Sequence, residues 1–480
     1  MVERLRKRYA SLSLQVRASF WFLVCSVLQK GISVITTPIF TRLLTTQEYG
    51  QYNVFNSWLA IVSVFVTLNM HAGVYTMGLV KFKEEARVFS SSLQGLSFTL
   101  CAIWTAIYVV TKDFWNGLFQ LTTVQMLCMF VMIWATHAFT FWMTEQRNEF
   151  RYRALVAATL VVSALKPIVG IVFVLHAEDK VTARILGLAL VELVGYIGFF
   201  IVQMKRGKVF YSAKYWKYAV VFNLPLVPHY LSNVILGSSD RIMIQRLVGE
   251  SAAGIYSLAY SLGQLMNMVN DALNKTMSPW IYQRIREEEY ADIHRVVYPS
   301  IACVGLANML LIVIAPEIVM VFAPPEYYEA IYTIVPVAIN GVFTYMYLCF
   351  APFEFYFEKR AWTTTATLVS AVTNIVLNFA LIPVFGYNAA GYTTLACSML
   401  NAVMHMYFMR RVCDDFLDGA RPYDTRFLVM MSGGFVLAGM LFIPTYGFPL
   451  VRYGMLIAAM GVALVKRREL VAFVKTAMGK

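Results

Sequence analysis

The sequence predicts an all-α integral membrane protein with about fourteen transmembrane helices. Two six-helix lobes, related as a parallel repeat, are expected around a central cavity, with two further helices at the C-terminus. Of the 480 residues, 59% are hydrophobic and only 14% are charged, whereas soluble domains carry roughly 25% charged residues. The mean hydropathy is +0.62. A soluble fold of this length could not bury so much apolar surface, so the bilayer is the natural solvent for this chain.

Fourteen apolar segments follow one another, each close to the roughly 20 residues that a spanning helix needs. Their length, and the lack of short alternating runs, favour helices over a barrel. The expected spans are 19–42, 50–70, 88–110, 117–141, 154–176, 183–204, 218–245, 252–277, 296–322, 330–353, 362–383, 389–409, 427–443 and 448–465.

The connections between these spans give the expected orientation. With the N-terminus in the cytoplasm, 30 of the 40 lysine and arginine residues fall on the cytoplasmic side and 6 on the opposite side. That bias follows the positive-inside rule, and one missed helix would scramble it. Both termini are therefore expected in the cytoplasm. The first 17 residues are too charged for a secretory signal peptide.

A short motif occurs twice at an offset of 204 residues, as RLLTTQEYGQY (42–52) and RLVGESAAGIY (246–256). Each copy lies at the outer end of a helix that enters from the cytoplasm, which favours a parallel repeat over chance. The alternative is that these letters simply suit tight outer turns. The matched positions are Arg42 with Arg246, Leu43 with Leu247, Gly50 with Gly254, and Tyr52 with Tyr256.

The repeat sets the expected domain organisation. An N-terminal lobe at 1–204 would hold spans one to six, and a C-terminal lobe at 218–410 would hold spans seven to twelve. A basic cytoplasmic linker at 205–217 would join them. A cytoplasmic loop at 411–426 would precede the last two spans and a basic tail at 427–480.

Several charged residues lie inside the predicted spans, where charge is rare and usually faces the bundle interior. Polar side chains recur at helical spacing beside them, as in the stripe 267–275 of span eight. A water-filled cavity between the lobes would hydrate these faces. The alternative is packing, for instance an ion pair of Asp271 with Lys275, or of Asp240 with Arg241. The intramembrane charges are Lys30, Lys166, Glu192, Asp240, Arg241, Asp271, Lys275, Glu317 and Glu354.

Such a cavity would be cationic. Lys30, Arg241 and Lys275 would attract an anion, above all a phosphate or diphosphate. Asparagines on the same faces, namely Asn270, Asn274 and Asn374, could hydrogen-bond sugar hydroxyls. Glu354 is a further candidate for tuning or coupling, and His229 is more readily explained by packing.

Other functional classes leave no signature in the sequence. There is no P-loop, no H-E-x-x-H motif and no Cys/His cluster. The seven cysteines lie mostly in apolar runs and fit buried hydrophobic positions. We expect no metal, no cofactor, no nucleic-acid partner and no enzymatic activity.

Two stretches carry a resemblance, TPIFTRLLTTQEYGQYNVF (37–55) and SSDRIMIQRLVGESAAGIYSLAYSLGQL (238–265). The chain resembles the Wzx-type lipid-linked oligosaccharide flippases, the polysaccharide transporters of the MOP superfamily. The resemblance implies a V of two lobes around a cationic cavity in a bacterial inner membrane. It implies movement of an undecaprenyl-diphosphate-linked repeat unit to the periplasmic leaflet, with coupling to an ion gradient.

The resemblance also implies roles for individual residues. Lys30, Arg241 and Lys275 would face the diphosphate, and Asp240 and Asp271 would tune or couple transport. Membrane lipids and the polysaccharide polymerase machinery are the implied partners. The rival interpretations are another exporter of the superfamily, for lipid II or drugs, and a membrane polysaccharide polymerase, which should present a larger outer loop.

Overall fold

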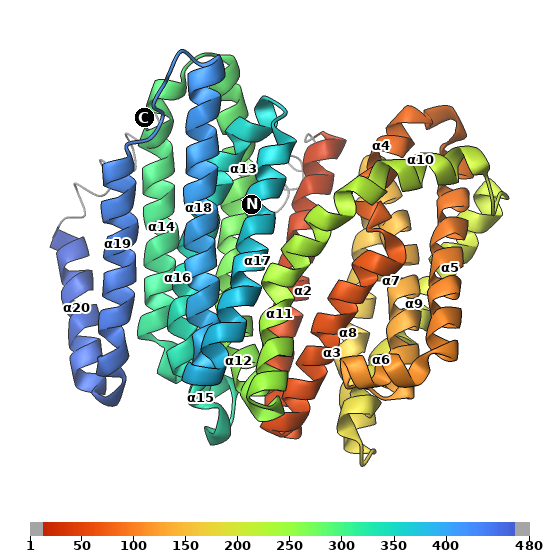
Figure 1. Cartoon of the computed structure of the whole chain (residues 1–480), viewed down its shortest axis with the longest axis horizontal. Coiled ribbons are helices and arrows are strands. Elements are labelled where there is room, and N and C mark those ends of the chain that lie inside the picture. The colour runs from red at the N-terminus through yellow and green to blue at the C-terminus, as the bar shows by residue number, and fades with distance from the viewer. Residues whose placement is uncertain (1–12, 466–480) are drawn as a thin grey trace, which may run out of the picture. The chain divides into compact units, whose positions relative to one another are not determined.

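The structure, a computed structural model, describes residues 13–465 and is almost entirely helical. The chain divides into two compact units, residues 1–234 and 235–480. The helix α11 (Val227–Leu247) contains the point of division. Figure 1 shows the order of the helices along the chain.

The first unit consists of long helices joined by short turns (Figure 1). Threonine caps begin two of them: Thr45 and Glu48 form a capping box at the start of α3, as do Thr122 and Gln125 at the start of α7. The helices are α2 (Leu14–Leu43), α3 (Thr46–Thr67), α4 (Val74–Lys81), α5 (Ala86–Val110), α6 (Lys112–Phe119), α7 (Thr123–Asn148), α8 (Tyr152–Leu175), α9 (Lys180–Gly207) and α10 (Ala213–Asn223).

The helix α10 packs onto the first unit through one face. Tyr215, Ala219 and Asn223 are buried at helical spacing. The Trp216 indole donates to the Ser92 carbonyl at 2.9 Å. Before α10, the chain lies directly on α5, since a Cβ added at Gly95 would come within 2.1 Å of the Phe210 carbonyl oxygen. Glycine is therefore required at position 95 for this close approach.

The second unit is built around the helix α16 (Ala330–Tyr356), most of which is buried. It packs against α12, α13, α14, α18 and α19. The other helices of this unit are α12 (Glu250–Gly263), α13 (Asn267–Arg286), α14 (Ile293–Val313), α15 (Ala315–Phe322), α17 (Arg360–Phe385), α18 (Asn388–Phe416), α19 (Thr425–Phe442) and α20 (Pro449–Val465).

The connection between α18 and α19 is tied down by Tyr423, which is buried and donates from its hydroxyl to the Cys349 carbonyl of α16 at 3.1 Å. Burial raises the pKa of Tyr423 well above its usual value. The hydroxyl therefore keeps its proton and remains a donor across the physiological range.

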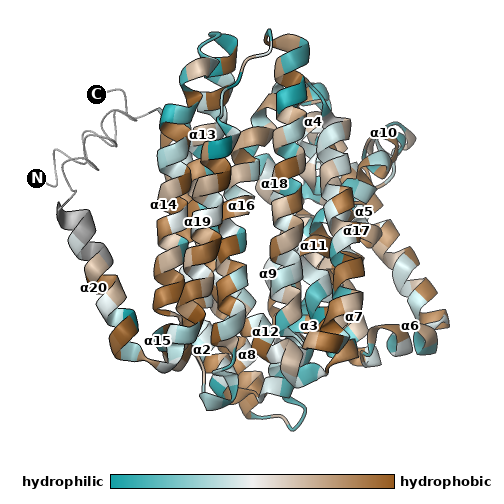
Figure 2. Ribbon diagram, turned by 60° about the vertical axis from the view of Figure 1, so that its left-hand side comes forward, coloured by the Kyte–Doolittle hydropathy of each residue, from teal (hydrophilic) through white to brown (hydrophobic). Residues whose placement is uncertain are grey.

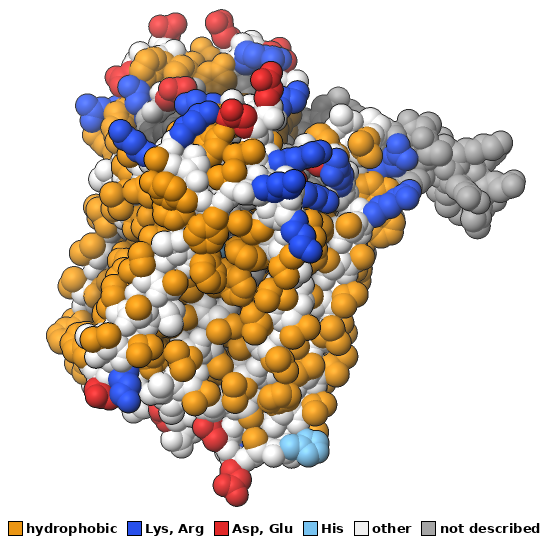
Figure 3. Space-filling view, turned by 90° about the vertical axis from the view of Figure 1, so that its right-hand side faces the viewer, with side chains coloured by type: hydrophobic (Ala, Val, Ile, Leu, Met, Phe, Trp, Pro, Cys, Tyr) orange, Lys and Arg blue, Asp and Glu red, His pale blue; other side chains and the backbone are white. Residues whose placement is uncertain are grey.

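Ten helical segments of the described residues are long and apolar enough to cross a membrane. Figure 2 shows long helices that are hydrophobic along much of their length, with hydrophilic residues toward their ends. On the face in Figure 3, hydrophobic side chains dominate the middle, and lysine and arginine gather toward one end. This pattern is that of a multi-pass membrane protein.

The four other expected spans correspond to α3, to α12 followed by α13, to α18 and to α20. Polar residues such as Asn53 and Asn56 of α3 and Asn270 of α13 dilute the hydropathy of these segments, and α20 has only 17 residues. The count of fourteen, the arrangement of the two lobes and the predicted domain boundaries therefore stay predictions.

Candidate functional site

The carboxylate of Asp240 is enclosed within the second unit, where it lies on α11 and is only 2% exposed. Three neutral donors reach it from three other helices. The Tyr256 hydroxyl of α12 donates to Oδ2 at 2.6 Å, and Thr394 of α18 donates to the same oxygen at 2.7 Å. The Asn378 amide of α17 donates to Oδ1 at 2.7 Å.

A second layer of polar groups holds these donors in place. The Asn374 amide donates to Thr394 Oγ1 at 3.1 Å, and its own oxygen accepts from Asn378 at 3.2 Å. The Thr393 hydroxyl donates to the Asn378 oxygen. Asn374 and Asn378 are fully buried. Buried networks of this kind are well ordered when every member is bonded.

Arg241 follows Asp240 directly in the chain. Its guanidinium lies over the Tyr260 ring, 4.3 Å from the centroid, and Nη1 donates to the Gly237 carbonyl at 3.3 Å. A carboxylate held by neutral donors in a low-dielectric interior can take up a proton or a small cation. We call Asp240, Tyr256, Asn374, Asn378 and Thr394 the Asp240 cluster.

A separate acidic group of the same unit joins α16, α17 and α18. Glu354 and His405 are both fully buried, and His405 Nδ1 lies 2.6 Å from Glu354 Oε1. The Thr363 hydroxyl donates to Glu354 Oε2 at 2.9 Å. The ring of Tyr347 lies 4.8 Å from the imidazole. This group can hold and move a proton between a carboxylate and an imidazole.

The first unit holds an ion pair between two of its helices. Lys166 Nζ of α8 lies 2.6 Å from Glu192 Oε1 of α9. The Thr136 hydroxyl of α7 donates to the other oxygen, Oε2, at 3.0 Å. The Glu192 side chain is 7% exposed and that of Lys166 is 30% exposed. The charges of Lys166 and Glu192 therefore neutralise each other.

A buried arginine of the first unit stacks on two aromatic rings, and one of them belongs to the first copy of the repeated motif. The Arg184 guanidinium of α9 lies 3.6 Å from the centroid of the Phe40 ring and 3.5 Å from that of Tyr52. Stacking of this kind stabilises a desolvated guanidinium. Tyr52 thus contacts a cation through its ring, whereas its repeat counterpart Tyr256 binds an anion through its hydroxyl.

Comparison with known families identifies the chain. Residues 16–284, more than half of its length, match the family described as polysaccharide biosynthesis protein. The chain belongs to this family. The resemblance expected from the sequence is confirmed at that level.

The curated relatives of the chain are distant in sequence. The chain is 18% identical over 379 residues to "Lsg locus putative protein 1" of Haemophilus influenzae, covering 75% of this chain and 89% of the relative. It is 23% identical over 174 residues to "Probable low-salt glycan biosynthesis flippase Agl15" of Haloferax volcanii, covering 35% and 37% of the two chains.

Solved structures show the fold. The structure matches "Lipid II flippase MurJ, inward closed conformation" with a TM-score of 0.67 at 11% identity, over 93% of this chain and 99% of that one. An inward-facing "multidrug resistance MATE family transporter of the MOP superfamily" matches with a TM-score of 0.59 at 13% identity, over 82% and 96%. The chain therefore has the fold of MOP-superfamily transporters.

The structure brings together some of the residues that the sequence singled out. Asn374 joins Asp240 in one network, with Arg241 beside it. Asn270 is buried elsewhere, where its amide donates to the Gly341 carbonyl of α16 at 2.9 Å, so it acts as a tie between helices. Asn274 accepts a hydrogen bond from Ser278 of its own helix.

The other expected cavity residues lie at more open positions. Lys275 and Asp271 are exposed on α13, and Lys30 is partly exposed on α2 of the first unit. Glu354 lies in its own group with His405. Whether Lys30 shares an anion site with Arg241 and Lys275 stays a prediction.

The residues of the repeated turns lie where one helix ends and the next begins. Arg42 closes α2 and donates to the Pro38 carbonyl at 2.9 Å, and Arg246 lies in the last turn of α11. Gly50 and Gly254 are buried near the starts of α3 and α12.

Several buried polar residues escaped the sequence analysis. Arg184 and Arg452 are two of the six basic residues that the predicted topology places opposite the cytoplasmic side, because each stands near the start of an apolar segment. Arg452 lies in α20, is 1% exposed and bonds the Glu317 carboxylate of α15, which also accepts from Tyr453. His405 stands inside an apolar segment, and that placement was an available signal for it.

Proposed function

We propose that this protein is a flippase that moves an undecaprenyl-diphosphate-linked oligosaccharide repeat unit from the cytoplasmic to the periplasmic leaflet. Alternating access between its two predicted lobes would carry the movement, and an ion gradient would drive it. The protein would be located in a bacterial inner membrane, with both termini in the cytoplasm. The polysaccharide polymerase machinery is the expected recipient of the flipped unit.

The observation that carries this proposal is the Asp240 cluster, read with the family and the fold. A carboxylate buried among neutral donors costs free energy in a membrane protein, so its presence there favours a functional role. A proton or cation that binds there from one side and leaves to the other would couple transport to its gradient. Asp240 is directly followed by Arg241, which is a candidate contact of the diphosphate. A movement of the backbone when an ion binds Asp240 would therefore also move Arg241.

Arg241, Lys30 and Lys275 are proposed to contact the diphosphate, and Asn274 to hydrogen-bond sugar hydroxyls. Arginine and lysine are the usual ligands of phosphate oxygens. Asp271 is proposed to tune the charge beside Lys275, one helical turn away. Glu354 with His405 is a second candidate for proton coupling.

The test is flipping by the full-length protein in vesicles. A fluorescent polyprenyl-diphosphate oligosaccharide in both leaflets would be reduced from outside, and the fraction that becomes accessible over time would be measured. We expect Arg241→Ala to abolish flipping and the matched control Arg286→Ala, at an exposed position of α13, to retain it. Equal activity of both variants would remove Arg241 from the path.

The coupling ion is tested in the same vesicles by imposing a proton or a sodium gradient. Wild type should accelerate in one gradient only, and Asp240→Asn should lose that acceleration, while Asp292→Asn at an exposed site should keep it. Lipid II and cationic dyes serve as alternative substrates. Transport of lipid II or of a dye in preference to the oligosaccharide lipid would favour the rival exporter interpretations.

In cells, the proposal predicts loss of surface polysaccharide and accumulation of the lipid-linked unit on the cytoplasmic side when the gene is deleted. The wild-type gene should restore the polymer, and Arg241→Ala should not. Normal polymer in a deletion strain that has no second exporter would contradict the flippase function.

A further inference from the structure

The first unit contains a cavity that none of the proposed transport residues lines. Its volume is about 290 Å³, and its accessible lining is entirely apolar. Four helices form its walls: α3, α5, α6 and α7. Its aromatic residues are Trp58, Phe65, Trp104, Tyr108, Trp115, Phe119 and Phe130.

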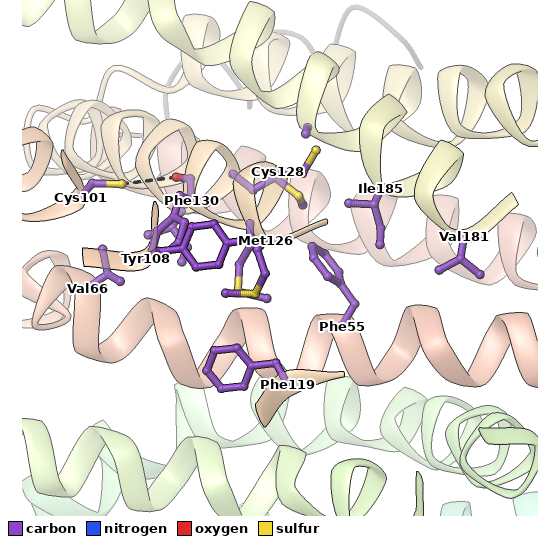
Figure 4. Packing of buried hydrophobic residues seen from close by; sticks show 14 residues of the cluster. Phe55, Val66, Cys101, Tyr108, Phe119, Met126, Cys128, Phe130, Val181 and Ile185 are labelled. Carbon is purple, nitrogen blue, oxygen red and sulfur yellow. Dashed lines mark hydrogen bonds between the residues drawn. The ribbon is translucent and has the colours of Figure 1, made fainter. Parts of the chain in front are cut away.

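The short helix α6 contributes Trp115 and Phe119 to the cavity wall. Its polar groups bond to their own neighbours. The Trp115 indole donates to Thr111 Oγ1 at 2.8 Å, and Asn116 accepts from the Tyr108 hydroxyl at 2.9 Å. The aromatic faces are thereby left for the cavity. Figure 4 shows Tyr108, Phe119, Met126 and Phe130 among the side chains of this core.

The aromatic walls support one another. The Phe119 ring lies 4.4 Å from that of Trp58 and 5.6 Å from that of Trp115. Phe65 is 44% exposed, so the cavity reaches the surface of the unit beside an apolar side chain.

The chemistry of such a space is restrictive. A cavity without polar atoms gives water no hydrogen-bond partners and stays dry. An empty space also forfeits dispersion contacts along its walls. A drug-like cation could contact the aromatic faces, but no carboxylate lines the cavity to offset its charge, and Asp113 of α6 is exposed outside it. A hydrocarbon chain needs no hydrogen-bond partner and restores the dispersion contacts along the walls.

We propose that this cavity binds the end of a hydrocarbon chain drawn from the surrounding bilayer. At about 30 Å³ for a water molecule, a similar size to a methylene group, 290 Å³ holds roughly ten such units. The chain belongs either to the polyprenyl tail of a carrier lipid or to a phospholipid. The site is distinct from the Asp240 cluster and does not require that the protein flips its carrier.

The experiment uses the full-length protein in lipid nanodiscs. One sample contains a polyprenyl phosphate with a photoactivatable diazirine near the end of its chain, and another contains a phosphatidylglycerol with a diazirine at the end of one acyl chain. After irradiation, the labelled peptides are identified by mass spectrometry. We expect adducts on residues 58–66 of α3 and 104–108 of α5.

A cavity-filling variant provides the control of position. Val62→Trp should lower labelling at these peptides by about tenfold or more, a difference of about 1.4 kcal/mol in binding. Val161→Trp, at a 57% exposed position on α8, adds the same side chain outside the cavity and should leave labelling unchanged. If Val62→Trp fails to fold, Val62→Phe fills less space, and Phe65→Ala enlarges the opening and should raise labelling.

The two probes distinguish the sources. Labelling by the polyprenyl probe alone assigns the site to the carrier lipid, and labelling by the acyl probe assigns it to bilayer phospholipid. Two results would overturn the proposal: labelling that Val62→Trp leaves unchanged, or displacement of both probes by a hydrophobic cation such as tetraphenylphosphonium at lower concentration than by unlabelled lipid. Because the readout is binding, failure of the flipping assay does not affect it.

Discussion

The repeat-related tyrosines Tyr52 and Tyr256 should respond differently to the loss of one hydroxyl group. Tyr256→Phe removes a hydrogen bond of 2.6 Å to the buried Asp240 carboxylate. Tyr52→Phe keeps the ring that lies 3.5 Å from the Arg184 guanidinium, and a phenylalanine ring also stacks on a cation. The same chemical change therefore acts on an anion in one unit and spares a cation contact in the other.

The magnitude depends on the charge of Asp240. A hydrogen bond to an ionised group contributes about 1.5–3 kcal/mol, whereas hydrogen bonds between membrane helices average about 0.6 kcal/mol. Tyr256→Phe should thus lower the free energy of unfolding by about 1.5–3 kcal/mol if Asp240 is ionised, and by about 0.6 kcal/mol if it is protonated. Tyr52→Phe should cost less than about 0.5 kcal/mol.

The assay is reversible unfolding in bicelles, measured for wild type and both variants at one pH. Repeating it with Asp240→Asn in the background completes a double-mutant cycle, in which the coupling between Tyr256 and Asp240 should account for most of the loss. A larger cost for Tyr52→Phe than for Tyr256→Phe would refute the reasoning, as would a coupling energy near zero.

Three further predictions concern the other buried charges. Lys166→Met should lower the free energy of unfolding by about 3 kcal/mol because it leaves Glu192 unpaired. The double variant Lys166→Met with Glu192→Met should come within about 1 kcal/mol of wild type. Reversible unfolding in bicelles measures both. Glu354→Ala should cost about 2–4 kcal/mol by stripping His405 of its partner, whereas Glu354→Gln should cost less than about half as much, and equal losses would contradict this. Arg452→Ala should speed proteolysis in the turn 443–448 several-fold by loosening α20, and unchanged cleavage would show that the arginine does not anchor it.

The fold was largely accessible from the sequence, because hydropathy and segment length carry most of the information about spanning helices. The segments 88–110, 154–176 and 330–353 correspond closely to α5, α8 and α16. Expected spans with many polar residues, such as 252–277, correspond to broken helices, here α12 and α13 with a three-ten turn at Gln264–Met266. Hydropathy does not resolve such a break.

The candidate site was less accessible. Asn374 and Asn378 are four residues apart and therefore share one face of α17, but no local pattern links them to Asp240, which precedes Asn378 by 138 residues. The stripe of α13 was also read as one functional face, whereas the structure divides it: Asn270 is buried against α16 and Asp271 is exposed. Periodicity gives the face of a helix and leaves its partner undetermined.

The close approach of Gly95 to the Phe210 carbonyl has a practical meaning for anyone who modifies this protein. The basic segment 205–217, which includes the connection between α9 and α10, is the predicted linker between two lobes, so it invites use as a fusion site or a place to divide the gene. Inserted sequences are accepted where the backbone is exposed and makes few contacts. Here the backbone lies on α5 and leads into a helix whose Tyr215 and Asn223 are buried. A reporter inserted at 208–212 would have to displace that helix, and two separately expressed halves joined there would each begin or end with an unprotected apolar surface.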